Sequence, residues 1–221
     1  MAETSTSSPR LRDGFRAALP LAPSPVLFGL SYGVLADATG FGAAAAVVMS
    51  ATTFAGAAQF ASVSVLDAGG TVAAAVLAAI FLNARYVAIS VTVASIFPGG
   101  RSRRLVESQA IVDESWALSG RRGRFEWPIL VGSGLVFYAL WVGSTALGTV
   151  LGGVFQDPNA LGLDAAFAAL FLALAMPYLK EPRARQAAAL AAVITLVLIP
   201  VAPAGVPIIA ASAACLLGLR R

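Results

Sequence analysis

The chain has 221 residues, of which 58% are hydrophobic and 12% are charged. A soluble domain carries about 25% charged residues, so a soluble fold of this length could not cover so much apolar surface. In a bilayer this difficulty disappears, because the surrounding solvent is itself apolar. The net charge of +4 does not indicate a nucleic-acid partner, because nearly all basic residues cluster beside apolar runs. We therefore predict one integral membrane domain.

The N-terminal segment 1–14 is polar and rich in Ser and Thr. Such a composition cannot bury enough apolar surface to offset the entropy of ordering, so we predict a disordered tail. It ends in a basic flank formed by Arg10, Arg12 and Arg16. The rest of the chain, 15–221, is expected to form a single transmembrane domain.

Apolar runs fill most of that domain, and a spanning helix needs about 20 apolar residues. The runs cover residues 17–36, 41–66, 71–97, 127–155, 161–179, 186–202 and 206–219. The last two are short, and Pro203 and Gly205 lie between them, so we expect a helical hairpin that spans or only dips into the bilayer. The pattern predicts an all-α, polytopic transmembrane bundle with about six or seven apolar helical segments.

The polar segment 99–126 contains six arginines and is too polar to lie in hydrocarbon. Within it, residues 105–118 could form a surface helix. Cytoplasmic loops carry an excess of Lys and Arg. This rule predicts that both termini, the segment 99–126 and the basic linker 180–185 are cytoplasmic, in a multi-pass protein of the bacterial inner (cytoplasmic) membrane.

The number of crossings before the segment 99–126 must be even. Three apolar runs lie between two cytoplasmic flanks, so one run has to enter and leave on the same side. We predict that 41–66 is re-entrant, because Ala55, Gly56, Ala57 and Ala58 interrupt it midway. Irregular backbone at membrane depth is tolerated only where it is buried in protein or lines a cavity. Broken or re-entrant helices are therefore expected within 41–97.

Arg85 is the strongest polar signal in the apolar runs. It lies in the middle of the run 71–97, roughly 20 Å from either end at 1.5 Å per residue, which is too far for its side chain to reach water. An arginine at the centre of a membrane helix costs about 2.5–3.5 kcal/mol on insertion scales. Arg85 therefore needs a partner: an acidic side chain, helix-end carbonyls or an anionic substrate. A purely structural clamp is the alternative.

Two further polar features stand out. Gln59 follows the interruption at Gly56, where a broken helix exposes N–H or C=O groups that transporters use to bind charged substrates. An interhelical hydrogen bond from Gln59 is an equally good interpretation. Asp113 and Glu114 are adjacent carboxylates in the polar segment, and such pairs are usually just solvated.

No enzyme signature accompanies these features. The sequence contains no histidine, which removes the commonest general base and metal ligand. It also lacks a Walker A loop, a Rossmann glycine pattern and a nucleophile elbow. We expect no enzyme activity, no metal and no cofactor.

Four short motifs give the chain a resemblance to a known family. They are 28–33 (FGLSYG), 54–60 (FAGAAQF), 83–86 (NARY) and 112–117 (VDESWA). Their order and spacing resemble the AzlC family, the large subunits of branched-chain amino acid permeases, over about residues 15–219. Two departures are Tyr86, where the family often has His, and Pro25, where the family's proline lies closer to the Phe-Gly pair.

The resemblance implies export of branched-chain amino acids such as valine, together with a small AzlD-like membrane subunit. It also implies that Asp113 and Glu114 have a role, in coupling or gating. We predict that Arg85 binds the substrate carboxylate. The remaining predicted substrate-binding residues are Asn83, Gln59, Gly56, Phe60 and Tyr86. The alternative function is a membrane scaffold or assembly subunit without transport activity of its own.

Overall fold

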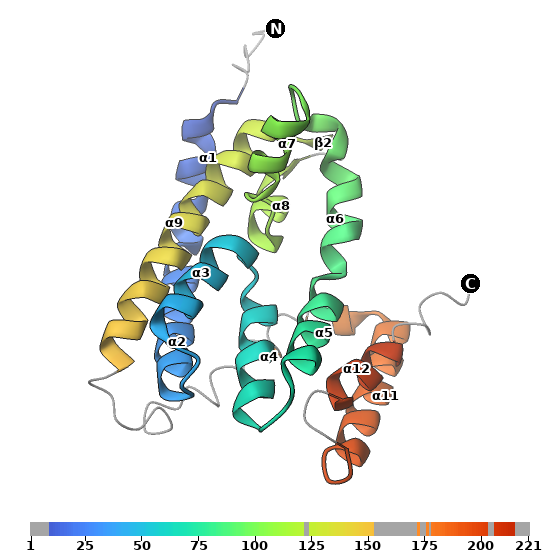
Figure 1. Ribbon diagram of the computed structural model, residues 1–221. Coiled ribbons are helices and arrows are strands. Elements are labelled where there is room, and N and C mark those ends of the chain that lie inside the picture. The colour runs from blue at the N-terminus through green and yellow to red at the C-terminus, as the bar shows by residue number, and fades with distance from the viewer. Residues whose placement is uncertain are drawn as a thin grey trace, which may run out of the picture.

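The computed structural model describes residues 9–121, 124–152, 172, 176, 178–202 and 206–214. These residues are almost entirely helical, as predicted, and the exception is a short antiparallel pair of strands, β1 (Gly120–Arg121) and β2 (Arg124–Phe125). Figure 1 shows the arrangement. The helices are α1 (Leu11–Ala18), η1 (Leu19–Leu21), α2 (Pro23–Ala38), α3 (Ala43–Thr53), α4 (Gly56–Asp67), α5 (Val72–Asn83), α6 (Arg85–Val93), η2 (Ala94–Ile96), α7 (Arg101–Ser108), α8 (Asp113–Ser119), α9 (Trp127–Gly152), η4 (Tyr178–Lys180), α11 (Pro182–Leu198) and α12 (Val206–Ser212).

Two stretches of the described chain are long and apolar enough to cross a bilayer. They are Val72–Ile96, with 25 residues, and Trp127–Gly152, with 26 residues. A third crossing results if α1, η1 and α2 are one bent span. The predicted count of six or seven is not confirmed. Most of the predicted run 161–179 and the end of the run 206–219 lie outside the described residues.

The first span extends beyond the apolar run 17–36. It begins at Leu11 and bends by 65° between η1 and α2. Pro20 and Pro23 flank the bend, where each removes a backbone donor and prevents a regular helix from continuing. The predicted tail is therefore wrong for residues 11–14. Gly14 is buried in α1, where an added Cβ would lie 2.8 Å from the carbonyl oxygen of Ile129 in α9.

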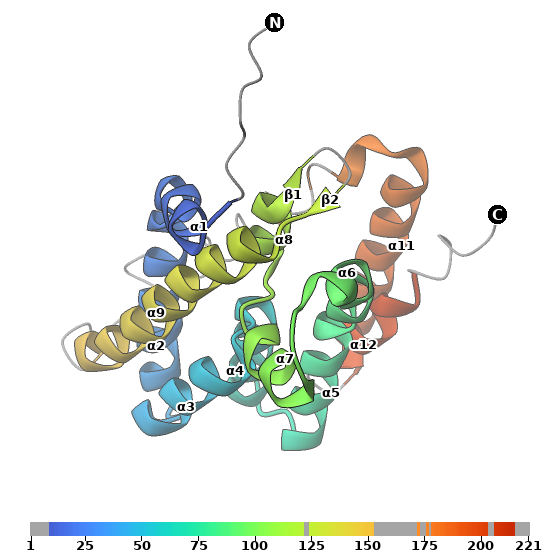
Figure 2. The same ribbon diagram turned by 90° about the horizontal axis from the view of Figure 1, so that it is seen from above.

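Helices α2 and α9 pack side by side through glycines (Figures 1 and 2). A Cβ on Gly33 would lie 2.8 Å from the Cα of Gly148, and a Cβ on Gly148 would lie 3.0 Å from the Cα of Gly33. Real side chains do not tolerate such distances, so the two backbones meet only because both residues are glycine. Small residues allow this close approach in membranes, and Gly33 and Gly148 have that packing role here.

The break predicted in the run 41–66 is present. It lies at Phe54 and Ala55, slightly earlier than expected, and Gly56 already begins α4. Phe54 adopts a left-handed conformation with φ 42°, and Ala55 is extended. Figure 1 shows that α3 starts and α4 ends toward the same end of the molecule. This is the path of a re-entrant segment.

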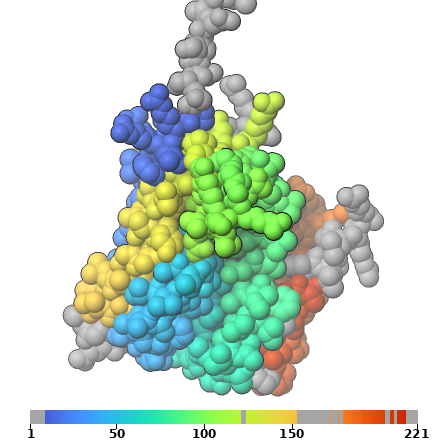
Figure 3. All heavy atoms as spheres, turned by 45° about the horizontal axis from the view of Figure 1, so that its top comes forward, coloured from blue at the N-terminus to red at the C-terminus, as the bar shows by residue number. Residues whose placement is uncertain are grey.

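The predicted surface helix over 105–118 is two helices instead. Figure 3 shows α7, in green, on the surface of the molecule. The chain then turns inward, and α8 begins at Asp113 against the interior (Figure 1). Ser115 fixes this start, because its Oγ accepts a hydrogen bond from the N–H of Val112 at 3.0 Å. Part of the segment 99–126 thus enters the fold, contrary to the prediction of a purely cytoplasmic loop.

Labelling of single cysteines tests the orientation. In a Cys215→Ser background, we expect a membrane-impermeant maleimide applied to whole cells to label Thr71→Cys and not Ser108→Cys. The reason is that α7 and the start of α5 lie at opposite ends of the molecule (Figure 1), and the arginines of α7 favour the cytoplasm. Position 108 should react after permeabilisation. Labelling of position 108 in intact cells would contradict this orientation.

Candidate functional site

A cavity of about 110 Å³ lies where the interrupted helices converge. The bend before α2, the break between α3 and α4, the break between α5 and α6, and the start of α8 all contribute to it, and α9 forms a wall. The lining residues are Ser24, Pro25, Phe28, Phe54, Gly56, Ala57, Phe60, Arg85, Tyr86, Val112, Asp113, Glu114, Phe137 and Trp141. Residues from 24 to 141 in the sequence thus meet in one place.

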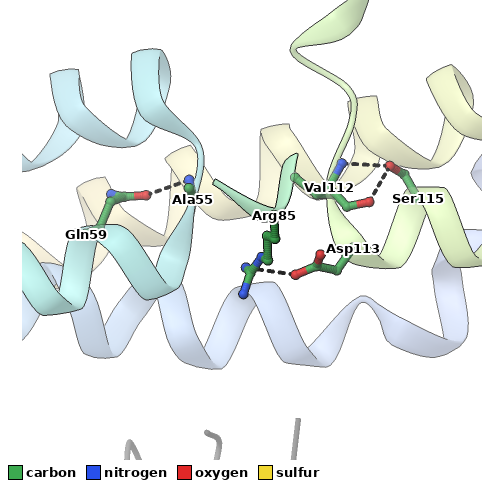
Figure 4. A network of polar contacts seen from close by, with 6 residues as sticks. All are labelled: Ala55, Gln59, Arg85, Val112, Asp113 and Ser115. Atoms are coloured by element: carbon green, nitrogen blue, oxygen red, sulfur yellow. Dashed lines mark hydrogen bonds and ion pairs between the residues drawn. The ribbon is translucent and has the colours of Figure 1, made fainter. Parts of the chain in front are cut away.

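Arg85 forms an ion pair with Asp113 across this cavity. Its Nη2 lies 2.8 Å from Oδ2 of Asp113, and Figure 4 shows the two side chains reaching toward each other from α6 and α8. The partner that a mid-membrane arginine requires is therefore an acidic side chain. Both side chains remain partly exposed, at 39% for Arg85 and 36% for Asp113. The pair lines the cavity instead of being sealed in the core.

Glu114 gives the cavity a second carboxyl group. Burial raises the pKa of Glu114 above its ordinary value, because the charged form is desolvated. A hydrogen bond from its own backbone opposes this rise in pKa, the charge of Asp113 adds to it, and the charge of Arg85 opposes it. Asp113 and Glu114 therefore differ in environment: Asp113 has a direct cationic partner, and Glu114 is held where protonation is favoured.

The N-terminus of α4 faces the same cavity. Gly56 and Ala57 are the first residues of this helix and line the cavity, and the first N–H groups of a helix have no partner within it. A helix of this length also presents partial positive charge at its N-terminus. A Cβ on Gly56 would lie 2.7 Å from Cη2 of Trp141, so glycine is needed for this close contact.

Aromatic rings form the apolar wall. Phe60 packs edge-to-face with Trp141, their ring centroids 6.5 Å apart, and with Tyr32 at 5.4 Å. Phe54 packs in the same way on Tyr138 at 5.1 Å. Such edge-to-face pairs stabilise a fixed ring arrangement. The rings of this wall therefore hold one another in a defined arrangement.

Gln59 is the first of two predicted residues that the structure places outside the cavity. It is fully buried. Its Oε1 accepts from the indole N–H of Trp141 at 3.0 Å, and its Nε2 donates to the Ser50 hydroxyl at 2.8 Å. The backbone N–H of Ala55 also donates to Oε1, at 3.3 Å (Figure 4). Gln59 thus makes the interhelical hydrogen bond that was the alternative interpretation. It fixes the backbone at the break between α3 and α4 and the position of the Trp141 ring.

Asn83 also lies outside the main cavity, and its Oδ1 is buried without a hydrogen-bond partner in the described part of the chain. It belongs to a groove along one face of α6. The groove is lined by Asn83, Tyr86, Val87, Ser90, Val91 and Ala94. Of the predicted binding residues, Arg85, Gly56, Phe60 and Tyr86 line the main cavity, as do Asp113 and Glu114.

Several lining residues were not predicted from the sequence. Phe28 and Phe54 lie inside the motifs 28–33 and 54–60, so the motifs contained a signal for them. Ser24 and Pro25 reach the cavity because of the bend in the first span, which the prolines signalled. Phe137 and Trp141 of α9 had no signal, because a helix that is apolar on all sides gives no periodicity from which to choose a face.

Comparison with known proteins agrees with the motifs that line this cavity. The family described as AzlC protein matches residues 20–155. The chain belongs to the AzlC family. This AzlC chain is similar to an uncharacterized membrane protein of Archaeoglobus fulgidus, with 31% identity over 188 residues that cover 82% of each chain. It is also similar to an uncharacterized membrane protein of Helicobacter pylori, with 23% identity over 190 residues, or 84% of this chain and 83% of the other. No solved structure matches.

Replacing the half-buried carboxyl of Glu114 tests whether its pKa is raised. The folded protein binds the Glu114 proton more tightly than the unfolded chain does, so native stability falls as pH rises from the ordinary glutamate pKa through the raised one. Glu114→Gln is neutral throughout. We expect its thermal midpoint to equal that of wild type below about pH 4 and to exceed it by a few degrees at neutral pH.

Asp67→Asn serves as the control for this measurement, because Asp67 is an exposed carboxylate at the end of α4. We expect it to leave the difference between acidic and neutral pH unchanged. A Glu114→Gln midpoint that lies below wild type at neutral pH and approaches it at acidic pH would show that the carboxylate is stabilised in its charged form.

Proposed function

We propose that this AzlC protein is a membrane transporter subunit that moves branched-chain amino acids of the valine type across the cytoplasmic membrane, in the direction of export, together with a small AzlD-like subunit. The observation that supports this function most is the cavity in which Arg85, Asp113 and Glu114 face a wall of aromatic rings. The family resemblance supports the same conclusion.

The chemistry of the cavity fits an amino acid with an apolar side chain. Such a solute has a carboxylate, an ammonium group and a hydrocarbon portion. Arg85 offers a planar fork of donors that matches a carboxylate, and the start of α4 adds partial positive charge. The carboxylates of Asp113 and Glu114 suit an ammonium group. Phe60 and its neighbours suit the hydrocarbon.

The position and size of the cavity fit a transporter of small solutes. Drug-sized ligands occupy pockets of about 300–1,000 Å³, so 110 Å³ suits a molecule with few heavy atoms. Transporters bind substrates near the middle of the bilayer, at discontinuous helices whose N-termini face anionic groups. The breaks at Phe54 and near Arg85 supply two such discontinuities.

Asp113 and Glu114 are proposed to couple or gate transport. Glu114 is the better candidate for a coupling proton, because burial already favours its protonated form. Asp113 is the better candidate for gating, because its ion pair with Arg85 connects α8 to α6. An ion pair that spans two short helices can open only if those helices separate or a ligand replaces one partner.

The small subunit is proposed to cover the face of α5 and α6. Within the structure only 11% of the span Val72–Ile96 is buried, compared with 56% of Trp127–Gly152. A groove lined by Asn83, Tyr86, Val87, Ser90, Val91 and Ala94 runs along this face. A neighbouring transmembrane helix would fill this groove.

Arg85 variants test the transport function. We expect Arg85→Ala to abolish valine flux per folded complex, because a substrate carboxylate then has no cationic partner. Arg85→Lys keeps the charge but loses the fork, so we expect flux to fall by at least about tenfold. The measurement is radiolabelled valine flux in vesicles, normalised to the folded complex counted by size-exclusion chromatography.

The ion pair itself gives the scaffold alternative its support, because Arg85 already has a structural partner in Asp113. A scaffold in which Arg85 is only a clamp makes the opposite prediction. Arg85→Ala would then reduce the amount of folded complex, and any complex that remained would transport as wild type does. Valine flux per complex near the wild-type value in Arg85→Ala would reject Arg85 as the carboxylate site.

A matched pair of tryptophan variants tests the partner surface. Val87 on α6 and Val150 on α9 are equally exposed, at 70% and 71%. We expect Val87→Trp to lose the small subunit during co-purification, because the ring fills the groove, and Val150→Trp to retain it. Loss of the subunit in both variants, or in neither, would reject the α6 face as the contact surface. Full valine transport by the single chain in liposomes would reject the need for a partner.

A further inference from the structure

The carboxylate of Asp113 occupies the position at Arg85 that a substrate carboxylate would need. The contact within ion-pair distance joins one guanidinium nitrogen, Nη2, to one oxygen, Oδ2. A guanidinium has five donors arranged as a fork, so the ion pair with Asp113 and the contact with Tyr86 leave part of this fork for another ligand. An amino acid can therefore approach the same cation without first dismantling the surrounding core.

A zwitterion can enter this ion pair without leaving any charge unpaired. Before binding, the cavity contains one ion pair, that of Arg85 with Asp113. Afterwards it would contain two, with the substrate carboxylate on Arg85 and the substrate ammonium on Asp113. A molecule with only one of these charges would take one partner and leave the other uncompensated, and an uncompensated charge away from water is costly.

We propose that Asp113 is an internal substitute for the substrate carboxylate. In the empty transporter, Asp113 holds Arg85. When the carboxylate of the amino acid displaces Asp113 from Arg85, Asp113 turns to the ammonium group of the same amino acid. This inference rests on the proposed function and deepens it, because it explains selection of the complete amino acid over its deaminated and decarboxylated analogues.

The location of Asp113 suits such an exchange. Asp113 is the first residue of α8, where the backbone changes from the extended conformation of Val112 to the helix. Its side chain is 36% exposed and lines the cavity, so a modest rotation reaches a new partner. A partly exposed ion pair is also only weakly stabilising. Displacing it therefore demands little binding energy from the substrate.

Valine and two analogues of the same shape separate the two charges. Isovalerate lacks the ammonium group, and isobutylamine lacks the carboxylate. In the purified two-subunit complex, we expect radiolabelled valine to bind and both analogues to compete at least about tenfold more weakly than unlabelled valine does. This factor is the usual loss when one charged hydrogen bond is removed.

Asp113→Asn then provides the decisive comparison. The variant removes the competitor for Arg85 and the partner of the ammonium, so isovalerate should bind more tightly than it does to wild type. The ratio of the valine to the isovalerate affinity should fall by at least about tenfold. Asp113 competes with the carboxylate of valine and with that of isovalerate for Arg85 to the same extent. This competition therefore cancels in the ratio of the two affinities, and the ratio reports only the contact of Asp113 with the ammonium group. Asp113→Ala is expected to shift the ratio in the same direction and serves if the Asn variant folds poorly.

Glu107→Gln is the matched control. It breaks the other ion pair of the described chain, in which the largely buried Glu107 accepts from Arg103 at 2.6 Å; a Gln oxygen can still accept from the indole N–H of Trp127. It should leave the ratio unchanged. If wild type binds valine and the ratio is also unchanged in both Asp113 variants, Asp113 is only a structural clamp and the inference is wrong. If wild type binds no valine, the proposed function itself fails.

Discussion

The structure depends on one constraint, which is that a broken helix inside a membrane must find partners for its backbone within the protein. At the break between α3 and α4 these partners come from distant parts of the chain. Tyr138 of α9 donates to the carbonyl oxygen of Ala51 at 2.9 Å, and Gln109, just after α7, donates to that of Thr52 at 2.9 Å. Gln59 accepts the N–H of Ala55. The irregular backbone is stable because side chains replace the missing helical hydrogen bonds.

This constraint also explains why charge and cavity coincide. The groups that satisfy a break have to gather around it, and the space beside it cannot be filled by a regular helix. Arg85 and Asp113 compensate each other in that space, which removes the cost of either charge alone. The cavity is thus bounded by fixed hydrogen bonds on one side, at Gln59, and by an ion pair on the other. The hydrogen bonds of Gln59 can remain intact while Arg85 and Asp113 change partners.

Part of this arrangement could be predicted from the sequence. The interruption at Gly56 and the isolated charge of Arg85 stand out because glycine and arginine are unfavourable in apolar helices. The inward turn of α8 could not be predicted, because Asp113 lies in a polar segment and only its contact with Arg85 shows that it enters the fold. Gln59 had two equally good interpretations, and only the position of Trp141 distinguishes them.

The glycine contact between α2 and α9 has a consequence for how such a protein could move. Backbones that touch at Gly33 and Gly148 leave no space between the two helices, so we expect α2 and α9 to move together as one frame. The opposite wall differs, since α6 is connected to α8 by single polar contacts such as the hydrogen bond from Trp116 to Thr92 at 2.9 Å. Alternating access would then be an asymmetric motion, in which one wall stays still and the wall of short helices opens.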